Sequence, residues 1–335
     1  MVPPRLTVAV TGPTGTFGFG LVPLLQADER IERIIGIARR PFDPAEFGWS
    51  KMSYCQGDVR EPQALEAAFR GTDVVVHLAF MITGTASREN IRAINVEGTL
   101  NALEAAAKAG AKRFVYSSSV AAYGFHRDNP IGMTEDWPAR RANHLFYAQE
   151  KADIERLLSE RSAAHADLAL YMLRPPIVLG PHAVGAKALL PGPLSAWAGR
   201  VATAVSRFPL KPPLVLPGVP IQFIHEDDVG RAFLRCVVGA GPPGAYNIAA
   251  DEVMTADEVS RELGFPTLRV PEAPVHNAAR ALASLPRPSF LPPTTEWVEA
   301  ISHPAIMDTS KARKQLGWKP RYTARQALRG TLAAS

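Results

Sequence analysis

Short apolar runs and amphipathic stretches alternate through the first half of the chain. Apolar runs typical of buried strands lie at residues 6–10, 33–38, 53–56, 73–78, 113–117 and 168–173. Between them lie stretches with helical spacing, among them 61–71 and 94–110, which both end close to a glycine, a common helix stop. Strands that are apolar throughout and separated by helices are typical of a parallel sheet covered on both faces. We therefore predict an α/β fold with a doubly wound parallel sheet.

Prolines crowd the second half of the chain, beginning with "RPPIVLGP" at 174–181 and "RFPLKPPLVLPGVP" at 207–220. Regular strand–helix alternation cannot continue through such segments. Helical patterns remain at 226–241, 255–264 and 308–318. We predict a main domain formed by residues 1–179 and 221–250, and a smaller, mostly irregular and helical substrate lobe formed by residues 180–220 and 251–335.

Composition narrows the functional class. The chain has 335 residues, of which 47% are hydrophobic and 21% charged, as in soluble globular proteins. Its apolar runs are too short for a membrane span, its N-terminus lacks a signal-peptide layout, and Cys55 and Cys236 form neither a disulfide framework nor a metal-type spacing. We expect a cytoplasmic protein without a metal site. The net charge is +5, but Lys and Arg are scattered, which favours an anionic small molecule over nucleic acid.

The run "VAVTGPTGTFG" at 8–18 places glycines directly between the first strand and a helix start. Gly12 suits a tight turn, Gly15 lets a phosphate approach the backbone, and Gly18 lets helix and strand pack closely. The N-terminus of the helix would favour a pyrophosphate. The pattern predicts a dinucleotide site in a Rossmann-type domain. We assign seven residues of the loop to the cofactor: Thr11, Gly12, Thr14, Gly15, Thr16, Phe17 and Gly18.

The end of the second strand, "GIARRP", bears on the choice of cofactor. Ala38 stands where an acidic residue would bind the ribose 2′-hydroxyl of NAD, and Arg39 and Arg40 follow it. Arginine suits a 2′-phosphate by charge and by bidentate geometry. We therefore favour NADP(H) over NAD(H). The alternative is that the two arginines form a solvated strand end, with one of them stacked on adenine.

Tyr147 and Lys151 lie four residues apart in "FYAQEKADIERLL" and so share a face of the predicted helix. A nearby ammonium favours the phenolate and lowers the pKa of tyrosine. We expect Lys151, together with the positive nicotinamide ring of a cofactor, to lower the pKa of Tyr147 so that it could exchange a proton with a substrate oxygen near neutral pH. "VYSSSVAAYG" places Ser117 and Ser119 at the end of the fifth strand, where ligands bind in open α/β sheets. Ser119 would hold the substrate oxygen beside Tyr147, and Lys151 would also hold the nicotinamide ribose.

With these motifs in order, the chain resembles the extended short-chain dehydrogenase/reductases, also called the NAD-dependent epimerase/dehydratase family. The resemblance covers nearly the whole chain and rests on segments such as "TGPTGTFG", "DVVVHLAF", "INVEGT", "YAQEK", "LRPPIVLGP" and "FIHEDDVG". It implies that Tyr147 is the catalytic acid/base, with Lys151 and Ser119 as its partners. It also implies a homodimer formed through helices 94–109 and 146–161.

The resemblance assigns further residues to the ligands. On the cofactor path it implies Asp58 and Val59 at the adenine, Asn95 near the active centre, and the neighbouring residues Leu78, Ala79, Phe80, Ser117, Pro175 and Ile177. Facing the substrate, we expect Ser119, Val120 and His144.

The chain departs from the family pattern at several positions. Glu150 replaces the serine that commonly precedes the lysine, and Phe80 ends the usual "HLAA" segment; both changes are expected to reshape the rim of the pocket. Ile221 and Gln222 stand where nucleotide-sugar enzymes of the family often carry an arginine toward substrate phosphates. We therefore favour a dehydrogenase or reductase acting on a small, hydrophobic carbonyl or alcohol. A nucleotide-sugar epimerase or dehydratase and a cofactor-sensing binding protein are the alternatives.

Overall fold

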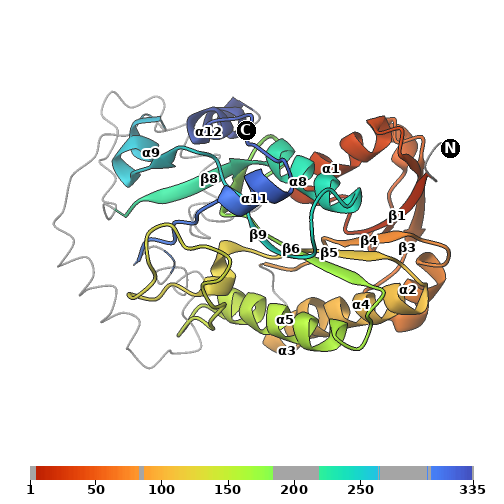
Figure 1. The fold of residues 1–335 in the computed structure, drawn as a ribbon. Coiled ribbons are helices and arrows are strands. Elements are labelled where there is room, and N and C mark those ends of the chain that lie inside the picture. The colour runs from red at the N-terminus through yellow and green to blue at the C-terminus, as the bar shows by residue number, and fades with distance from the viewer. Residues whose placement is uncertain are drawn as a thin grey trace.

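The main sheet is seven-stranded and parallel (Figure 1). The computed structural model describes residues 5–82, 87–183, 219–262, 264, 300 and 303–333. The strand order is β3-β2-β1-β4-β5-β6-β9, so the direction of winding reverses between β1 and β4. The strands span Leu6–Thr11 (β1), Ile31–Ala38 (β2), Met52–Gln56 (β3), Val74–His77 (β4), Arg113–Ser117 (β5), Ala169–Arg174 (β6) and Gly244–Asn247 (β9). The predicted Rossmann-type, doubly wound sheet is confirmed, and each of the six apolar runs contains a strand.

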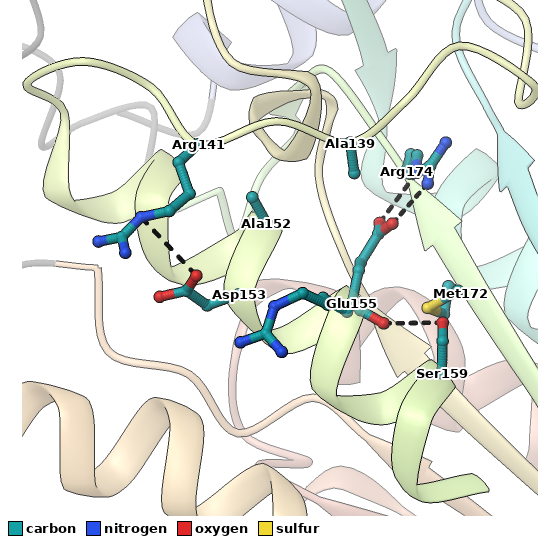
Figure 2. A pocket seen from close by; sticks show the side chains of 9 residues that line it. Ala139, Arg141, Ala152, Asp153, Glu155, Ser159, Met172 and Arg174 are labelled. Atoms are coloured by element: carbon teal, nitrogen blue, oxygen red, sulfur yellow. Dashed lines mark hydrogen bonds and ion pairs between the residues drawn. The ribbon is translucent and has the colours of Figure 1, made fainter. Parts of the chain in front are cut away.

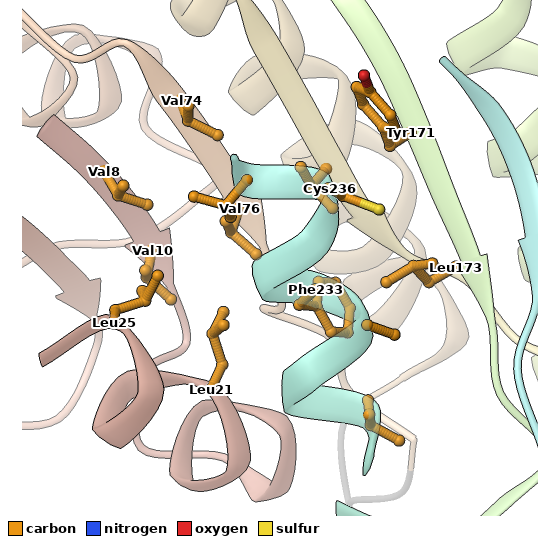
Figure 3. Close-up of a cluster of buried hydrophobic side chains, with 14 of the residues drawn as sticks. Val8, Val10, Leu21, Leu25, Val74, Val76, Tyr171, Leu173, Phe233 and Cys236 are labelled. Atoms are coloured by element: carbon orange, nitrogen blue, oxygen red, sulfur yellow. The ribbon is translucent and has the colours of Figure 1, made fainter. Parts of the chain in front are cut away.

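Two helical layers cover the sheet (Figure 1). One face carries α1 (Thr16–Ala27), α8 (Glu226–Val237) and α11 (Ser310–Gln315), and the other carries α2 (Pro62–Ala68), α4 (Gly98–Lys108) and α5 (Phe146–Ser162). Side chains of β1, β4, α1 and α8 interdigitate in the first core (Figure 3). The α1 and α8 backbones touch there, since a Cβ on Gly20 would lie 2.3 Å from the carbonyl oxygen of Glu226. Such close contact between two helices excludes any larger residue at position 20.

The helix predicted over 94–110 differs from expectation at its start. A short helix, α3 (Arg88–Arg92), leads into a π-helical turn, η2 (Ala93–Glu97), and only then into α4. The buried Asn95 side chain leaves this turn to bond the backbone of Met81 in both directions, at 2.7 and 2.9 Å. Single π-turns within helices commonly mark functional sites. The turn therefore fixes the segment that follows β4.

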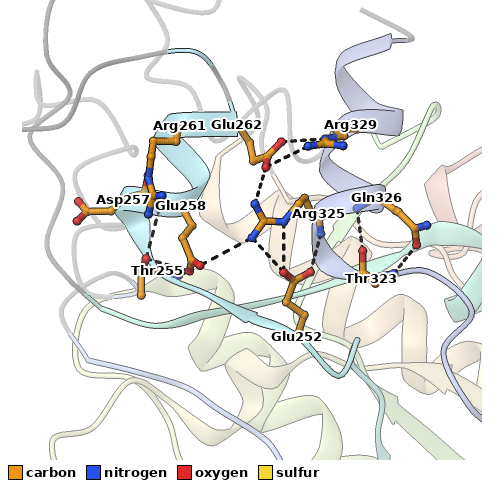
Figure 4. A network of polar contacts seen from close by, with 10 residues as sticks. All are labelled: Glu252, Thr255, Asp257, Glu258, Arg261, Glu262, Thr323, Arg325, Gln326 and Arg329. Carbon is orange, nitrogen blue, oxygen red and sulfur yellow. Dashed lines mark hydrogen bonds and ion pairs between the residues drawn. The ribbon is translucent and has the colours of Figure 1, made fainter.

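A second, three-stranded sheet has the order β10-β8-β7. Its strands span Ile177–Leu179 (β7), Ile221–His225 (β8) and Val253–Met254 (β10), and the helices beside it are α9 (Ala256–Glu262) and α12 (Ala324–Ala333). Arg325 of α12 binds Glu262 of α9 and Glu252, the residue before β10 (Figure 4). These contacts tie the two helices to each other and to the second sheet. Two short 3-10 helices, η1 (Pro44–Phe47) and η3 (Val120–Tyr123), lie in loops of the main domain.

The predicted boundary between domain and lobe stays a prediction, because most of the lobe (184–218 and 265–299) lies outside the described residues. Within residues 221–250, β9 joins the main sheet, whereas β8 belongs to the smaller one. The predicted helix over 308–318 is shorter than expected, covering Ser310–Gln315. The residue after it, Leu316, and Trp318 pack into the main core.

Candidate functional site

The glycine-rich loop lies at the C-terminal edge of the main sheet. Gly12 has a φ of +67°, and a Cβ at this position would lie 3.1 Å from the backbone of Ala79. The Thr11 hydroxyl accepts hydrogen bonds from the N–H groups of Leu78 and Ala79, each at 3.1 Å. These bonds hold the ends of β1 and β4 together at the reversal of the sheet, where ligands bind in such folds.

The loop passes directly into α1. Gly15 is the N-cap residue, and a Cβ on Gly18 would lie only 2.0 Å from the carbonyl oxygen of Pro13. The Thr16 hydroxyl donates a hydrogen bond to the carbonyl oxygen of His182, at 2.9 Å. Because a helix start presents N–H groups and the positive end of its dipole, this turn can hold a diphosphate. Two further loop residues are half-buried: Thr14 and Phe17.

Arg39 and Arg40 lie at the end of β2 with exposed side chains. Strand β3 holds their backbones, because Gln56 Nε2 donates to the carbonyl of Arg39 at 3.0 Å and the Tyr54 hydroxyl donates to that of Arg40. The main chain is therefore fixed while both guanidinium groups face solvent. An anionic group near the strand end would find two cations available there.

The next strand end holds Asp58 and Val59. Arg60 binds both carboxylate oxygens of Asp58, at 3.1 and 2.8 Å, and this hydrogen bonding lowers the pKa of Asp58. The negative charge beside Arg39 thus has its own partner. Val59 is buried against Gly98 of α4. Asp58 therefore lies beside the strand end that carries Arg39, and the Val59 side chain turns into the core.

The three serines at the end of β5, Ser117 to Ser119, have separate partners. The carbonyl oxygen of Ser117 accepts from Lys151, and the Ser118 hydroxyl donates to Glu155. The Ser119 hydroxyl accepts from the N–H of Ala121 at 3.1 Å, which caps η3, and it is also hydrogen-bonded to Tyr147. Ser119 and Tyr147 therefore lie close together at the strand end. Ser117 and Ser118 are hydrogen-bonded to residues of α5, the helix that carries Tyr147.

Tyr147 and Lys151 both project from α5 toward the end of β5. Lys151 is buried and donates to the Ser117 carbonyl at 2.7 Å and to the Tyr116 hydroxyl at 3.1 Å. Its Nζ lies 5.9 Å from the centroid of the Tyr147 ring. The i, i+4 spacing thus brings the two side chains to one face, as the sequence predicts.

Burial dominates the pKa values of both Tyr147 and Lys151. Burial raises the pKa of Tyr147 to about 12, and the hydrogen bond with Ser119 offsets only part of this effect. Burial also lowers the pKa of Lys151 to about 7, against the attraction of Glu155 and Glu150. The Lys151 amine donates to the Tyr116 hydroxyl. The lower pKa that we expect for Tyr147 from Lys151 together with a positive nicotinamide ring stays a prediction.

The remaining predicted residues differ in burial. Phe80 is half-buried, and its ring lies against Tyr147 and Lys151. Pro175 is buried, and its carbonyl oxygen accepts from the N–H of Val120 at 2.9 Å. Ile177 is half-buried at the start of β7, and the His144 side chain is exposed just before α5.

Sequence reasoning missed a buried ion pair below the serines. Glu155 of α5 binds Arg174 of β6, and both residues line a pocket of about 380 Å³ between α5, β6 and residues 139–141 (Figure 2). Glu155 is four residues beyond Lys151, so helical spacing already places both on one face. Its partner on β6, by contrast, has no signal in the local pattern.

A second residue missed from sequence is His77, the last residue of β4. Its ring is fully buried between the hydroxyls of Thr11, at 2.9 Å, and Thr99, at 3.0 Å. Burial lowers the pKa of His77 to about 3, so the imidazole is neutral. It joins the glycine-rich loop to α4 and adds no charge to the site.

The described residues contain no group of three or more His, Cys, Asp or Glu side chains arranged to hold a metal ion. None of the helices in the described part of the chain has the length and apolar character that crossing a membrane requires.

Comparison with known proteins relates the chain to a protein family, to an uncharacterized protein and to two solved structures. The model of the NAD dependent epimerase/dehydratase family matches residues 8–249. An uncharacterized protein of Mycobacterium tuberculosis is 26% identical over 330 residues, which cover 96% of this chain and 82% of that protein.

Two solved structures share the fold. The crystal structure of gox2253 has a TM-score of 0.76 and 23% identity, and the match covers 98% of both chains. The Bordetella bronchiseptica enzyme WbmG, in complex with NAD and UDP, has a TM-score of 0.71 and 22% identity, with 100% of this chain and 96% of that chain covered.

Proposed function

Because the chain belongs to the NAD dependent epimerase/dehydratase family, we propose that it is an NAD(P)-dependent oxidoreductase acting on a carbonyl or secondary alcohol of a small substrate. The observation that carries this proposal is the meeting of Ser119, Tyr147 and Lys151 at the sheet edge that also holds the glycine-rich loop. A hydroxyl, a phenol and an amine at a strand end are the groups that proton transfer to a substrate oxygen requires.

The residues at the sheet edge fit a dinucleotide. Gly12 packs against the backbone of Ala79, whereas Gly15 is exposed and its nearest neighbour is 3.5 Å away, so a ligand can come near the backbone at Gly15, and α1 starts immediately behind it. Gly12, Gly15 and Thr16 would hold the diphosphate, and Arg39 and Arg40 would face the adenosine end.

The proposed chemistry divides between cofactor and protein. When bound, the nicotinamide supplies or accepts hydride. Tyr147 donates a proton to the substrate oxygen during reduction and removes it during oxidation, while Ser119 holds that oxygen by hydrogen bonding. Because burial raises the pKa of Tyr147 to about 12, the phenol is protonated at neutral pH in the free protein and is ready to act as an acid.

Replacement of the tyrosine tests the proposal. Tyr147→Phe should abolish oxidation of NADPH or NADH by a panel of aliphatic and aromatic ketones, while binding of both cofactors, followed by fluorescence, persists. Tyr171→Phe is the matched control, because the Tyr171 hydroxyl bonds the Gly241 carbonyl outside the site. Activity of Tyr147→Phe equal to that of the control would refute the role of Tyr147.

We further propose a preference for NADP(H) over NAD(H). Two exposed guanidinium groups at the end of β2 support it, together with the pairing of Asp58 by Arg60, which removes the nearest repulsive charge. Arg39→Ala with Arg40→Ala should weaken NADPH binding more than tenfold and leave NADH binding nearly unchanged. Arg33→Ala, an exposed arginine of the same strand, is the control. Tighter binding of NADH than of NADPH by the unaltered protein would overturn the preference.

The substrate is proposed to be small and apolar. Ile221 and Gln222 stand where nucleotide-sugar enzymes of the family often carry an arginine toward substrate phosphates. The Gln222 amide is hydrogen-bonded to the backbone N–H and carbonyl of Met307, at 2.8 and 3.0 Å. This position therefore offers no cation to a pyrophosphate.

Nucleotide-sugar epimerisation is the second candidate, and the family match favours it. The two reactions differ in the fate of the cofactor. An epimerase would keep its cofactor through purification and would convert UDP-sugars without net change in nicotinamide absorbance. A reductase releases the changed cofactor and shows that change at every turnover.

We also propose a homodimer through helices 94–109 and 146–161. The corresponding elements, η2 with α4 and then α5, lie side by side on one outer layer of the molecule (Figure 1). Light scattering coupled to gel filtration should give twice the chain mass, and Arg156→Glu on the exposed side of α5 should reduce it. A monomeric mass for the unaltered protein would refute the proposal.

A further inference from the structure

One aromatic ring covers both functional side chains of α5. Phe80 belongs to the segment after β4, and its ring centroid lies 3.7 Å from the Nζ atom of Lys151. The same ring meets the Tyr147 ring edge-on, with centroids 5.6 Å apart and planes at 87°. Phe80 therefore belongs to the segment that borders the glycine-rich loop, and its ring packs on the proposed proton-transfer pair, Tyr147 and Lys151.

The contacts of the Lys151 amine define what Phe80 does there. Two sides of the amine are used by the Ser117 carbonyl and the Tyr116 hydroxyl. A further side faces the Phe80 ring, and the Lys151 residue is only 3% exposed. Since an ammonium carries three N–H groups, the ring occupies the direction in which water or a ligand hydroxyl would otherwise reach the amine.

The position of Phe80 is held by its neighbours. Asn95 bonds both the N–H and the carbonyl of Met81, the residue that follows Phe80. Asn95 Nδ2 also donates to Glu150 Oε2 at 2.8 Å, and Glu150 is 1% exposed. Two departures from the family pattern, at positions 80 and 150, are therefore joined through one buried amide.

We propose that Phe80 is a positioning residue for Lys151: its ring presses the amine against Tyr116 and Ser117 and excludes water, so that Phe80 determines the charge of Lys151 in the cofactor-free protein. The consequence for turnover rests on the function proposed above. Lys151 and Tyr147 would act together in proton transfer only when the Phe80 ring, by excluding water, sets the charge of Lys151.

Two effects of the ring on the amine oppose each other. The face of an aromatic ring attracts a cation and favours the charged form, whereas exclusion of water disfavours it. Burial lowers the pKa of Lys151 to about 7, so exclusion dominates.

The other ionisable groups around Lys151 come from three elements. Glu150 and Glu155 of α5 favour the ammonium, and Tyr147 of the same helix is held protonated by its raised pKa. Tyr116 of β5 is fully buried with a raised pKa, and the neutral His77 lies in β4. Among the residues that the structure describes, Glu150 and Glu155 are therefore the charged groups that oppose the effect of Phe80.

Titration of Lys151 tests the proposal without any substrate. Protein labelled with ¹³C at lysine Cε is titrated by NMR without cofactor, and Lys151→Met identifies the Lys151 resonance. Phe80→Ala admits water and should raise the titration midpoint by about one pH unit or more. Phe80→Leu keeps water out but removes the ring face, so its midpoint should stay at or below that of the unaltered protein.

Controls separate the ring from general loosening. Phe42→Ala removes a half-buried ring of a different cluster and should leave the midpoint unchanged. An unchanged midpoint in Phe80→Ala, or equal rises in Phe80→Ala and Phe80→Leu, would overturn the proposal. If Phe80→Ala does not fold, Phe80→Val serves in its place, with a smaller rise expected and no rise counting against the proposal.

A second readout connects the seal to turnover. The pH profile of kcat should shift in Phe80→Ala by the amount seen in the titration. A shifted titration in a protein without oxidoreductase activity would refute the proposed function and leave the role of Phe80 intact. Normal activity with an unshifted titration would refute the role of Phe80 alone.

Discussion

The ion pair between Glu155 and Arg174 allows a quantitative test of how the site is held in place. The two side chains are 4% and 6% exposed, and Arg174 Nε lies 2.9 Å from Glu155 Oε1, with a second contact between Nη2 and Oε2. The hydroxyl of Ser118 donates to the carboxylate, and Arg174 donates to the Tyr123 hydroxyl at 2.7 Å. Helix α5 is thus fastened to β5 and β6 directly below the serines.

We predict that Glu155→Leu is strongly destabilising. The change leaves the Arg174 guanidinium buried with the Tyr123 hydroxyl as its remaining side-chain partner, and removing one member of a buried pair costs about 3–5 kcal/mol. That is a large share of the roughly 5–15 kcal/mol that stabilises a typical domain. Combining Glu155→Leu with Arg174→Met removes the stranded charge, so the double variant should be more stable than Glu155→Leu alone.

Urea unfolding followed by tryptophan fluorescence measures these differences. The control is Arg30→Ala, which removes an ion pair with Asp28 outside the helices of the proposed dimer, where the arginine side chain is 51% exposed. It should cost less than about 1 kcal/mol. The reasoning fails if Glu155→Leu costs no more than this control, or if the double variant loses the full sum of its two single changes.

Three further outcomes follow from the packing. Lys151→Met should stabilise the protein without cofactor, most strongly below about pH 7 and less as the pH rises toward 10.5. The reason is that between these pH values the native amine, with a pKa of about 7, binds fewer protons than the amine of the unfolded chain. A difference in urea stability that does not change with pH would contradict this. Gly20→Ala should cost about 1–3 kcal/mol, because the new Cβ would lie 2.3 Å from the Glu226 carbonyl oxygen. Gly330→Ala, with its nearest neighbour 3.8 Å away, is the control, and equal melting temperatures would argue against the close helix contact. Asp228→Asn should speed proteolysis of the C-terminal segment, since this buried carboxylate accepts hydrogen bonds from two of its backbone N–H groups, at 2.9 and 3.1 Å; an unchanged cleavage rate would refute it.

The strands and the nucleotide loop were accessible from sequence because their signals are local. A parallel strand buried on both faces is apolar throughout, so β1 and β4 show in any window of the chain. Gly12 and Gly18 stand where a side chain would collide with the backbone, and such a demand leaves a visible residue. The helical spacing likewise placed Tyr147 and Lys151 on one face.

Other features had no local signal. The Asn95 side chain in the π-turn is hydrogen-bonded to Met81, 14 residues away in the chain. The Gln222 side chain is likewise held by hydrogen bonds to the backbone of Met307, 85 residues away. The loss of water around Tyr147 and Lys151, which raises the pKa of the phenol and lowers that of the amine, also left no sign in the local pattern. Desolvation is a property of the packed site and cannot be read from spacing.

The sequence by itself determined the class of fold, the position of the nucleotide loop and the pair of residues on α5, since periodicity and glycine placement act over a few residues. Only the tertiary structure decided which groups Lys151 meets, that Phe80 covers it, and that Glu155 finds Arg174 across the sheet. The physical reason is that charge, burial and hydrogen-bond partners are set by atoms brought together from distant parts of the chain, whereas backbone conformation is set largely by neighbours along it.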